Sequence, residues 1–298
     1  MMKLTILTPT YNRGERLPNL YNSLKKQTNK DFEWIVVDDG SKDNTSDLVN
    51  SWIQHSEFGI RYFYKENGGK HTAINYALQV IDTELTFIVD SDDTLTENAV
   101  EIILRYHDRY VGEKQLCGYS FLRAYPDGRI NGKEFVPDEL VASYIDARIN
   151  MDDTFADKAE VFKTKCLREF PFPEYQGEKF LGEDIVWIRM AKKYMMVHIN
   201  KAIYIGNYQE DGLTQNRRRN NIKSPLGCMY RAKEFMIPEI KRKYRLKGGV
   251  QYIIYGKFAH LSIAKLLQNA EDKKLTCMCF LPGLIFYIIW KRKFCSVY

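Results

Sequence analysis

The stretch from residue 87 to residue 95 reads Phe-Ile-Val-Asp-Ser-Asp-Asp-Thr-Leu, an apolar run that ends in three carboxylates within four positions. A β-branched and aromatic run bounded by polar residues predicts a buried strand. Carboxylates this close repel one another, so they favour a sheet end where a divalent cation neutralises them. Oxygen ligands suit Mg²⁺ or Mn²⁺. The alternative is a solvated turn in which Asp93 or Thr94 caps a helix over 97–105.

Composition and charge bound the class of protein. The 298 residues are 45% hydrophobic and 28% charged, as in an ordinary globular protein. No signal peptide begins the chain, and the six cysteines lack metal-binding spacing, which predicts reduced thiols and a cytoplasmic protein. Residues 217–298 carry 18 Lys and Arg against 4 Asp and Glu (+14), whereas the preceding 216 residues carry 26 against 34 (−8). The basic part would attract nucleic acid or an anionic membrane surface.

Strand-like and helical segments alternate over the first 95 residues. Expected strands cover 3–8, 32–37, 60–64 and 85–89, and expected helices cover 17–27, 45–54 and 72–80. This order predicts an α/β fold with an open, mostly parallel sheet and helices on both faces. Unusual loops follow the strands at 9–14, 38–41, 67–71 and 90–93. Because ligands bind at the carboxyl ends of such strands, we expect the loops to converge on one site.

The four loops suit a nucleotide. Pro9–Tyr11 could wall a base, and Asp39 could accept a hydrogen bond from uracil or ribose. Asn67 offers both a donor and an acceptor, and Lys70 offers a point charge for phosphate. Each loop alone could instead be an ordinary turn or helix cap. The sequence contains neither a P-loop nor a G-x-G-x-x-G motif.

Four motifs stand in order along this third of the chain. They are Thr8-Pro9-Thr10-Tyr11-Asn12-Arg13, Val37-Asp38-Asp39-Gly40-Ser41, Asn67-Gly68-Gly69 with Ala73 and Asn75, and Asp90-Ser91-Asp92-Asp93. At this spacing they resemble family 2 glycosyltransferases with a GT-A fold, closely over the first third and more loosely to about residue 220. The resemblance implies an inverting transfer from a nucleotide-diphospho-sugar, most often a UDP-sugar, with Mn²⁺ or Mg²⁺.

The resemblance also implies roles for the acidic residues. Asp90-Ser91-Asp92 would be the DxD motif, with Asp92 nearest the metal and Asp90 facing the ribose or water around the metal. Asp39 and Pro9–Tyr11 would hold the nucleoside. Glu183 and Asp184 open an expected helix, where a carboxylate could simply be a cap. The resemblance assigns the general base to Asp184, with Glu183 in support.

The middle of the chain is expected to supply acceptor chemistry. A strand over 116–124 precedes a turn at Asp127-Gly128, and a helix is expected to start at Asp152-Asp153. The aromatic loop 170–175 could be a sugar platform or packing. After a strand over 197–204, the resemblance places Thr214, Asn216 and Arg217 near the diphosphate. Arg217–Arg219 could equally be a solvated loop or a face for anionic lipid.

The last 80 residues change character. Residues 228–244 and 250–268 show helical periodicity, punctuated by Gly248-Gly249. Leu275–Trp290 carries no charge and has basic residues on both sides. A helix of this length spans roughly 24 Å, less than the ~30 Å hydrocarbon core, and Pro282-Gly283 should interrupt it. We expect an interfacial membrane segment more than a true span, with a helix packed on the catalytic domain as the alternative.

The expected organisation is a GT-A catalytic domain over 1–220, with a nucleotide-binding half over 1–95 and an acceptor half over 96–220, before a basic helical region over 221–298. The leading hypothesis is a peripheral enzyme on the inner face of the cell membrane. It would extend a lipid-linked oligosaccharide or a capsule or exopolysaccharide precursor. Alternatives are a polymeric, teichoic-acid-like or protein acceptor or, in a different class, a basic nucleic-acid-binding protein or a non-catalytic assembly protein. The acidic loops would repel nucleic acid, so it is not expected as a partner; the chain could form a homo-oligomer.

Overall fold

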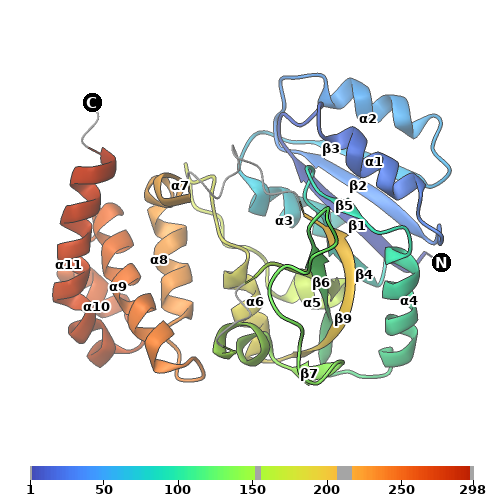
Figure 1. Ribbon diagram of the computed structural model, residues 1–298. Coiled ribbons are helices and arrows are strands. Elements are labelled where there is room, and N and C mark those ends of the chain that lie inside the picture. Colours follow the sequence, from blue (N-terminus) through green and yellow to red (C-terminus); the bar gives the residue numbers. More distant parts are fainter. Residues whose placement is uncertain (1, 152–155, 207–216, 296–298) are drawn as a thin grey trace. The chain divides into compact units, whose positions relative to one another are not determined.

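The computed structural model describes residues 2–151, 156–206 and 217–295 (Figure 1). The chain forms two compact units, which we call the N-terminal unit (Met1–Pro171 and Met190–Tyr208) and the C-terminal unit (Phe172–Arg189 and Gln209–Tyr298). The segment with the predicted general base therefore groups with the C-terminal helices. The expected catalytic domain over 1–220 stays a prediction, because compactness does not tell which segments act in catalysis.

A nine-stranded sheet forms the centre of the described N-terminal unit. Its strands are β1 (Leu4–Thr10), β2 (Phe32–Asp38), β3 (Gly59–Tyr64), β4 (Leu85–Ile88), β5 (Thr94–Leu95), β6 (Leu116–Ala124), β7 (Leu140–Ala142), β8 (Lys158–Lys163) and β9 (Met195–Ile205). The order is β3-β2-β1-β4-β8-β6-β9-β5, with β7 paired to β9. Strands β3, β2, β1 and β4 are parallel, whereas β8 lies antiparallel between β4 and β6. The predicted open, mostly parallel α/β sheet is confirmed.

Helices cover both faces of this sheet (Figure 1). Helices α1 (Leu17–Lys25), α2 (Thr45–Ile53) and α4 (Ala99–Tyr110) share one apolar core with it. Helix α3 (Lys70–Val80) packs on β1 and β2 from outside that core and contacts α5 (Thr164–Glu169). A short π-helix spans Ile145–Asn150. The strands and helices expected before residue 90 are confirmed to within 2 residues at each end.

The C-terminal unit is helical where it is described. It contains the start of α6 (Asp184–Ala191), then α7 (Arg217–Lys223), α8 (Pro225–Glu234), α9 (Arg242–Phe258), α10 (Ile263–Asn269) and α11 (Lys273–Cys295). Helix α9 packs against α8 and α11, and the three run alongside one another (Figure 1). Tyr252, Ile253 and Leu266 are among the buried residues of their shared core.

Two expected helix breaks are wrong. Helix α9 runs through Gly248 and Gly249, and α11 runs unbroken for 23 residues through Pro282. The glycines instead permit close helix contacts: a Cβ on Gly249 would lie 2.6 Å from Cys279 Sγ, and one on Gly283 would lie 2.6 Å from Ile253 Cβ. At 1.5 Å per residue α11 is about 34 Å long, so the argument that it is too short to cross a bilayer also fails.

Two expected helix starts are also wrong. Residues 158–163 form strand β8 between β4 and β6, not part of a helix begun at Asp152-Asp153; those two aspartates lie outside the described residues. Thr94 belongs to β5, and α4 begins at Ala99 with Asn98 at its N-cap position. Asp93 therefore does not cap the helix; its carboxylate binds elsewhere, as described below.

Candidate active site

The loops after β1 and β2 are tied to each other. The Asp39 N–H donates to the Thr10 carbonyl oxygen at 2.8 Å, and the Asn12 N–H donates to Ser41 Oγ at 2.8 Å. Lys42 N–H in turn donates to Asn12 Oδ1. Because each loop supplies hydrogen-bond donors and acceptors to the other, the two loops are fixed relative to each other.

Asp39 connects these loops to the one after β3. Its buried carboxylate accepts hydrogen bonds from the Gly68 and Gly69 N–H groups at 2.9 and 2.7 Å and from Lys65 Nζ at 2.7 Å. Asn67 donates its side-chain amide to the Asp39 carbonyl oxygen at 2.7 Å. A carboxylate offers about four acceptor positions, so about one remains for a ligand. The role predicted for Asp39 in nucleoside binding stays a prediction.

Gly40 permits this approach. Its backbone φ of 87° lies in the left-handed region, and a Cβ there would stand 2.9 Å from the Asn67 backbone nitrogen. Any other residue would strain the backbone and push the β3 loop away. The Asp-Gly pair after β2 is therefore required by the contact between two loops.

Lys70 and Asp90 bring the fourth loop into the same network. Lys70 Nζ at the start of α3 donates to Asp90 Oδ1, and the Arg123 guanidinium of β6 lies 3.8 Å from Asp90 Oδ2. Burial alone would raise the pKa of the Asp90 carboxyl, but the Lys70 and Arg123 charges lower it, and the net shift is downward. Asp90 is therefore ionised, and its negative charge is balanced by the cations of the protein.

Asp93 is bound by side chains from two strands, β6 and β9. Arg123 Nη2 lies 3.1 Å from Asp93 Oδ2, and Tyr204 of β9 donates its hydroxyl to the same oxygen at 2.7 Å. The Tyr204 hydroxyl also accepts the Asp90 N–H, and its ring stacks 3.6 Å from Arg123 Cζ. Arg123 and Tyr204 therefore fix both ends of the acidic turn.

The Asp92 carboxylate has fewer polar contacts than that of Asp90 or Asp93 in the described structure. Its Oδ2 lies 3.5 Å from Arg16 Nη1, and its Oδ1 has no partner among the residues that the structure describes. No group of three or more His, Cys, Asp or Glu forms a metal cage within that same part of the chain. Mg²⁺ commonly takes only one or two carboxylates together with substrate phosphates. One available carboxylate beside neutralised ones fits such a cation.

The base-binding segment predicted at Pro9–Tyr11 lies at the end of β1. Pro9 and Thr10 are buried, and Tyr11 is 45% exposed. Thr10 Oγ1 is buried without a hydrogen-bond partner in the described structure. A buried hydroxyl without a partner is costly, so a ligand that bonds to it would be favoured.

The other predicted site residues fall in the C-terminal unit or outside the described residues. Asp184 is the first residue of α6, where Arg231 of α8 binds its carboxylate, and Glu183 precedes it. Thr214 and Asn216 lie outside the described residues. Arg217 begins α7, and its side chain is not described.

The aromatic loop 170–175 has packing contacts of its own. Phe172 is buried and meets the Trp187 ring edge-on at 5.9 Å between centroids. Tyr175 stacks on Tyr230 of α8 at 5.4 Å. These contacts favour the packing alternative, since both rings already have a partner.

The sequence reasoning missed four basic residues and a tyrosine. The basic residues that each bind a site carboxylate are Arg16, Lys65, Arg123 and Arg231. Tyr204 bridges Asp90 and Asp93. Arg123 could have been found, because a charge inside the otherwise uncharged strand 116–124 needs a partner. The other four carried no comparable signal.

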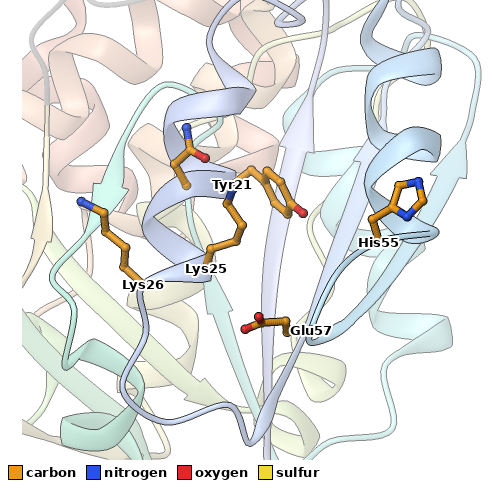
Figure 2. A pocket seen from close by; sticks show the side chains of 6 residues that line it. Tyr21, Lys25, Lys26, His55 and Glu57 are labelled. Carbon is orange, nitrogen blue, oxygen red and sulfur yellow. The ribbon is translucent and has the colours of Figure 1, made fainter.

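A surface hollow of about 510 Å³ lies away from these loops. Its lining residues are Tyr21, Asn22, Lys25, Lys26, His55 and Glu57. Figure 2 labels the three on α1 or just after it, Tyr21, Lys25 and Lys26, and the two on the connection from α2 to β3, His55 and Glu57. Lys25 and Lys26 precede β2 and Glu57 precedes β3, so the hollow lies at the amino ends of the parallel strands. Ligands of such sheets bind at the opposite edge.

Comparison with known proteins relates the chain to glycosyltransferases. Residues 5–132 match the family described as Glycosyl transferase family 2. A Campylobacter jejuni protein named GalNAc(5)-diNAcBac-PP-undecaprenol beta-1,3-glucosyltransferase is 28% identical, over 97% of this chain and 93% of its own. A Staphylococcus epidermidis teichoic acid poly(glycerol phosphate) polymerase is 35% identical, over 70% of this chain but only 28% of its own.

The fold of the chain is also found in a solved structure. The crystal structure of S. aureus TarS 1-349 in complex with UDP-GlcNAc matches with a TM-score of 0.60 and 18% identity, over 98% of this chain and 92% of that one. At this identity the match speaks for the fold alone. Taken with the family match and the relatives, it identifies the chain as a glycosyltransferase with the GT-A fold, and the chain belongs to glycosyltransferase family 2.

Proposed function

We propose that this glycosyltransferase transfers a sugar, with inversion, from a UDP-sugar to a hydroxyl of a lipid-linked oligosaccharide or surface-polysaccharide precursor. The observation that carries the proposal is a pair of contacts at the carboxyl edge of the sheet: Asp39 binds the loop that contains Asn67, and Lys70, which follows that loop, binds Asp90. The UDP-GlcNAc bound by TarS supports the donor class, and the PP-undecaprenol glycan in the name of the Campylobacter relative supports the acceptor class.

The strand-end loops bind different parts of the donor. Pro9–Tyr11, Asp39 and Asn67 hold the nucleoside, with the unpartnered Thr10 hydroxyl as one donor. Lys70, together with Thr214, Asn216 and Arg217, contacts the diphosphate. Asp92, with Asp90 beside it, would hold Mn²⁺ or Mg²⁺, which when bound neutralises charge on the departing diphosphate.

Proton transfer belongs to the acidic pair at the start of α6. The acceptor hydroxyl oxygen attacks C1 of the donor sugar while its proton passes to the Asp184 carboxylate. The bond between C1 and the diphosphate oxygen breaks, and UDP leaves with that electron pair. Attack opposite the leaving group converts an α-linked donor to a β-linked product. Glu183 supports the charge of Asp184.

A polymeric acceptor is the second candidate. The relative from Staphylococcus epidermidis, a teichoic acid polymerase by name, favours it, because its matching part is 35% identical to this chain. Both candidates use the same donor site and the same base. They differ only in the acceptor, so the first experiment addresses the donor.

The experiment is a thermal-shift panel of UDP-glucose, UDP-N-acetylglucosamine, UDP-N-acetylgalactosamine and GDP-mannose, each with Mn²⁺. A donor at about 100 times its Kd adds about 2.7 kcal/mol to the free energy of unfolding, which raises Tm by several degrees. We expect at least one UDP-sugar to do so and EDTA to abolish the shift.

A control variant identifies the site. Asp92→Asn should keep the wild-type Tm without ligand and lose the Mn²⁺-dependent part of the shift. The proposal fails if no UDP-sugar raises Tm, or if EDTA and Asp92→Asn leave the shift unchanged. The UDP-sugar with the largest shift then serves in hydrolysis assays, with water as the acceptor.

We also propose that α11 docks on the cytoplasmic face of an anionic membrane without crossing it. By length and composition Lys273–Phe294 could span a bilayer, which alone is weak support, and only 22% of its most apolar 18-residue window is buried. One side of α11 packs on α9, whereas apolar side chains elsewhere on α11 are exposed: Met278, Leu281, Ile285, Phe286, Ile288 and Ile289. Basic residues at both ends suit an interfacial helix, and α9 occupies one side of it.

Point variants test this better than deletion, because Leu275 and Cys279 belong to the core of the unit. Leu281→Glu with Ile285→Glu should reduce binding to phosphatidylglycerol vesicles at least about tenfold. Val111→Glu changes an equally exposed apolar residue of the N-terminal unit and serves as the control. Unchanged vesicle binding by the double variant would refute the membrane proposal.

A further inference from the structure

The carboxylate of Asp184 is bound by one guanidinium. Arg231 of α8 donates from Nε to Asp184 Oδ1 at 2.5 Å and from Nη2 to Asp184 Oδ2. Both side chains are mostly buried, with 17% of Arg231 and 22% of Asp184 exposed. A bidentate pair of this kind is both strong and directional, so it fixes the plane of the carboxylate. Both residues belong to the C-terminal unit.

The guanidinium is itself held in place. Arg231 Cζ lies 4.9 Å from the centre of the ring of Phe235, the residue that follows α8. Gly182 leaves the space that the pair occupies, because a Cβ there would lie 2.9 Å from Asp184 Oδ1 and 3.0 Å from Arg231 Nε. The glycine before the acidic pair is therefore required by the ion pair.

The segment before α6 rests on α8 at further points. Glu178 accepts hydrogen bonds from the Leu226 and Gly227 N–H groups at 2.7 and 2.8 Å, at the start of α8. The Phe180 N–H donates to Ser224 Oγ at 3.1 Å. Helix α8 thus fixes the backbone of the segment, and Arg231 fixes the Asp184 side chain.

We propose that Arg231 is a positioning residue for proton transfer: it orients the Asp184 carboxylate, so that a remaining lone pair receives the acceptor proton. This inference rests on the proposed role of Asp184 as the base. The two hydrogen bonds use one acceptor position on each oxygen, and a carboxylate offers about four. A carboxylate that can change rotamer freely would lose the alignment that in-line attack requires.

Other ionisable groups near the pair do not replace this role. Glu183 precedes Asp184, and Arg189 of α6 lies 3.9 Å from Glu234 of α8. Cys228 of α8 and Tyr255 of α9 lie close enough to Arg231 to act on it electrostatically. Burial raises the pKa of Tyr255 to about 12, so it is neutral at ordinary pH. Burial would lower the pKa of Arg231, but Asp184 raises it, and Arg231 remains charged.

The test compares Arg231→Ala and Arg231→Lys with the wild type in Mn²⁺-dependent hydrolysis of the selected UDP-sugar. Arg231→Ala should lower kcat about 100-fold, the usual effect of misplacing a reacting group by about 1 Å. KM for the donor should change less than about twofold. Arg231→Lys, which keeps the charge without the fork, should restore only part of kcat.

Glu178→Gln is the matched control, since it loosens the same segment on α8 without touching Asp184. It should lower Tm and leave kcat near the wild-type value. The inference is overturned if Arg231→Ala keeps or raises kcat, or if Glu178→Gln lowers kcat as much as Arg231→Ala does, as a merely structural contact predicts. If Asp184→Asn keeps full kcat, the proposed base itself is wrong, a failure distinct from any result with Arg231.

Discussion

The carboxylates at the sheet edge and the carboxylate of Asp184 are both paired with basic side chains, but in different ways. Asp90 is shared between two cations, while its neighbour Asp92 meets only the part-exposed Arg16 and keeps one oxygen without a partner in the described structure. Asp184 has both oxygens bound by Arg231. Dispersed pairing leaves one carboxylate available to a metal ion, whereas a bidentate pair fixes one carboxylate in direction. The first arrangement suits binding and the second suits proton transfer.

The largest expected effect comes from the available carboxylate. Asp92→Asn removes the charge that balances the cation, and a metal contribution of about 4 kcal/mol corresponds to about a 10³-fold loss of Mn²⁺-dependent UDP-sugar hydrolysis. Steady-state assays at varied Mn²⁺ measure it. Asp108→Asn, which removes an exposed partner of Lys3, should retain wild-type activity. Undiminished activity of Asp92→Asn would remove Asp92 from the metal site.

The oriented carboxylate should respond differently. Asp184→Asn removes the proton acceptor, and kcat should fall about 10²- to 10³-fold while donor KM stays near the wild-type value. Asp272→Asn breaks a comparable pair in the same unit, where Asp272 Oδ2 lies 2.8 Å from Arg245 Nη2. This control should keep its kcat. A loss of donor affinity in Asp184→Asn alone would assign that residue to donor binding.

The cations around the acidic turn should matter for stability. Arg123→Met leaves Asp93 beside Tyr204 without its guanidinium, and breaking a buried pair costs about 3 kcal/mol of the free energy of unfolding. Urea unfolding measures it. Arg129→Met removes an exposed pair with Asp127 and should cost less than about 0.5 kcal/mol. Equal costs for the two variants would contradict the structural role of Arg123.

The smallest expected effect concerns His198, which makes the free energy of unfolding depend on pH without acting in catalysis. Burial lowers the pKa of His198 to about 3. Between about pH 6.5 and pH 3 the unfolded chain therefore binds one more proton than the folded one, so the free energy of unfolding falls as pH falls. From pH 7 to pH 5 this loss is about 2 kcal/mol.

His198→Gln cannot titrate and retains an N–H donor for the Ala142 carbonyl oxygen, which His198 Nε2 contacts at 3.3 Å. Its free energy of unfolding should change less than that of the wild type between pH 7 and pH 5. The pH dependence of its kcat should be the same as that of the wild type. An identical pH dependence of unfolding in both proteins would show that His198 is not the group responsible.

The sheet and its loops were predictable because their signals are local. Strands end where Pro, Gly, Asn and Asp gather, and parallel strands send all those ends to one edge. The resemblance implies that Asp92 lies nearest the metal, but no local pattern shows which carboxylate remains available. That depends on Arg123 and Tyr204, which lie at least 30 positions from Asp90 and Asp93 in the chain.

The C-terminal unit was harder to predict because the same residue has two uses. Glycine in a helix can mark a break or permit a close contact, and only the neighbouring helix decides between them. Gly249 and Gly283 belong to the second kind, since Cys279 and Ile253 fill the space beside them. Arg231 lies 47 positions from Asp184, so no local pattern joins the two.

The most direct test of the division between binding and proton transfer is calorimetric titration of UDP with Mn²⁺ into the wild type, Asp92→Asn and Asp184→Asn. The account predicts that Asp184→Asn binds UDP with the wild-type Kd, and that Asp92→Asn binds it about 100-fold more weakly, a loss of about 2.7 kcal/mol. A Kd weakened as much by Asp184→Asn as by Asp92→Asn, or unchanged in Asp92→Asn, would contradict it.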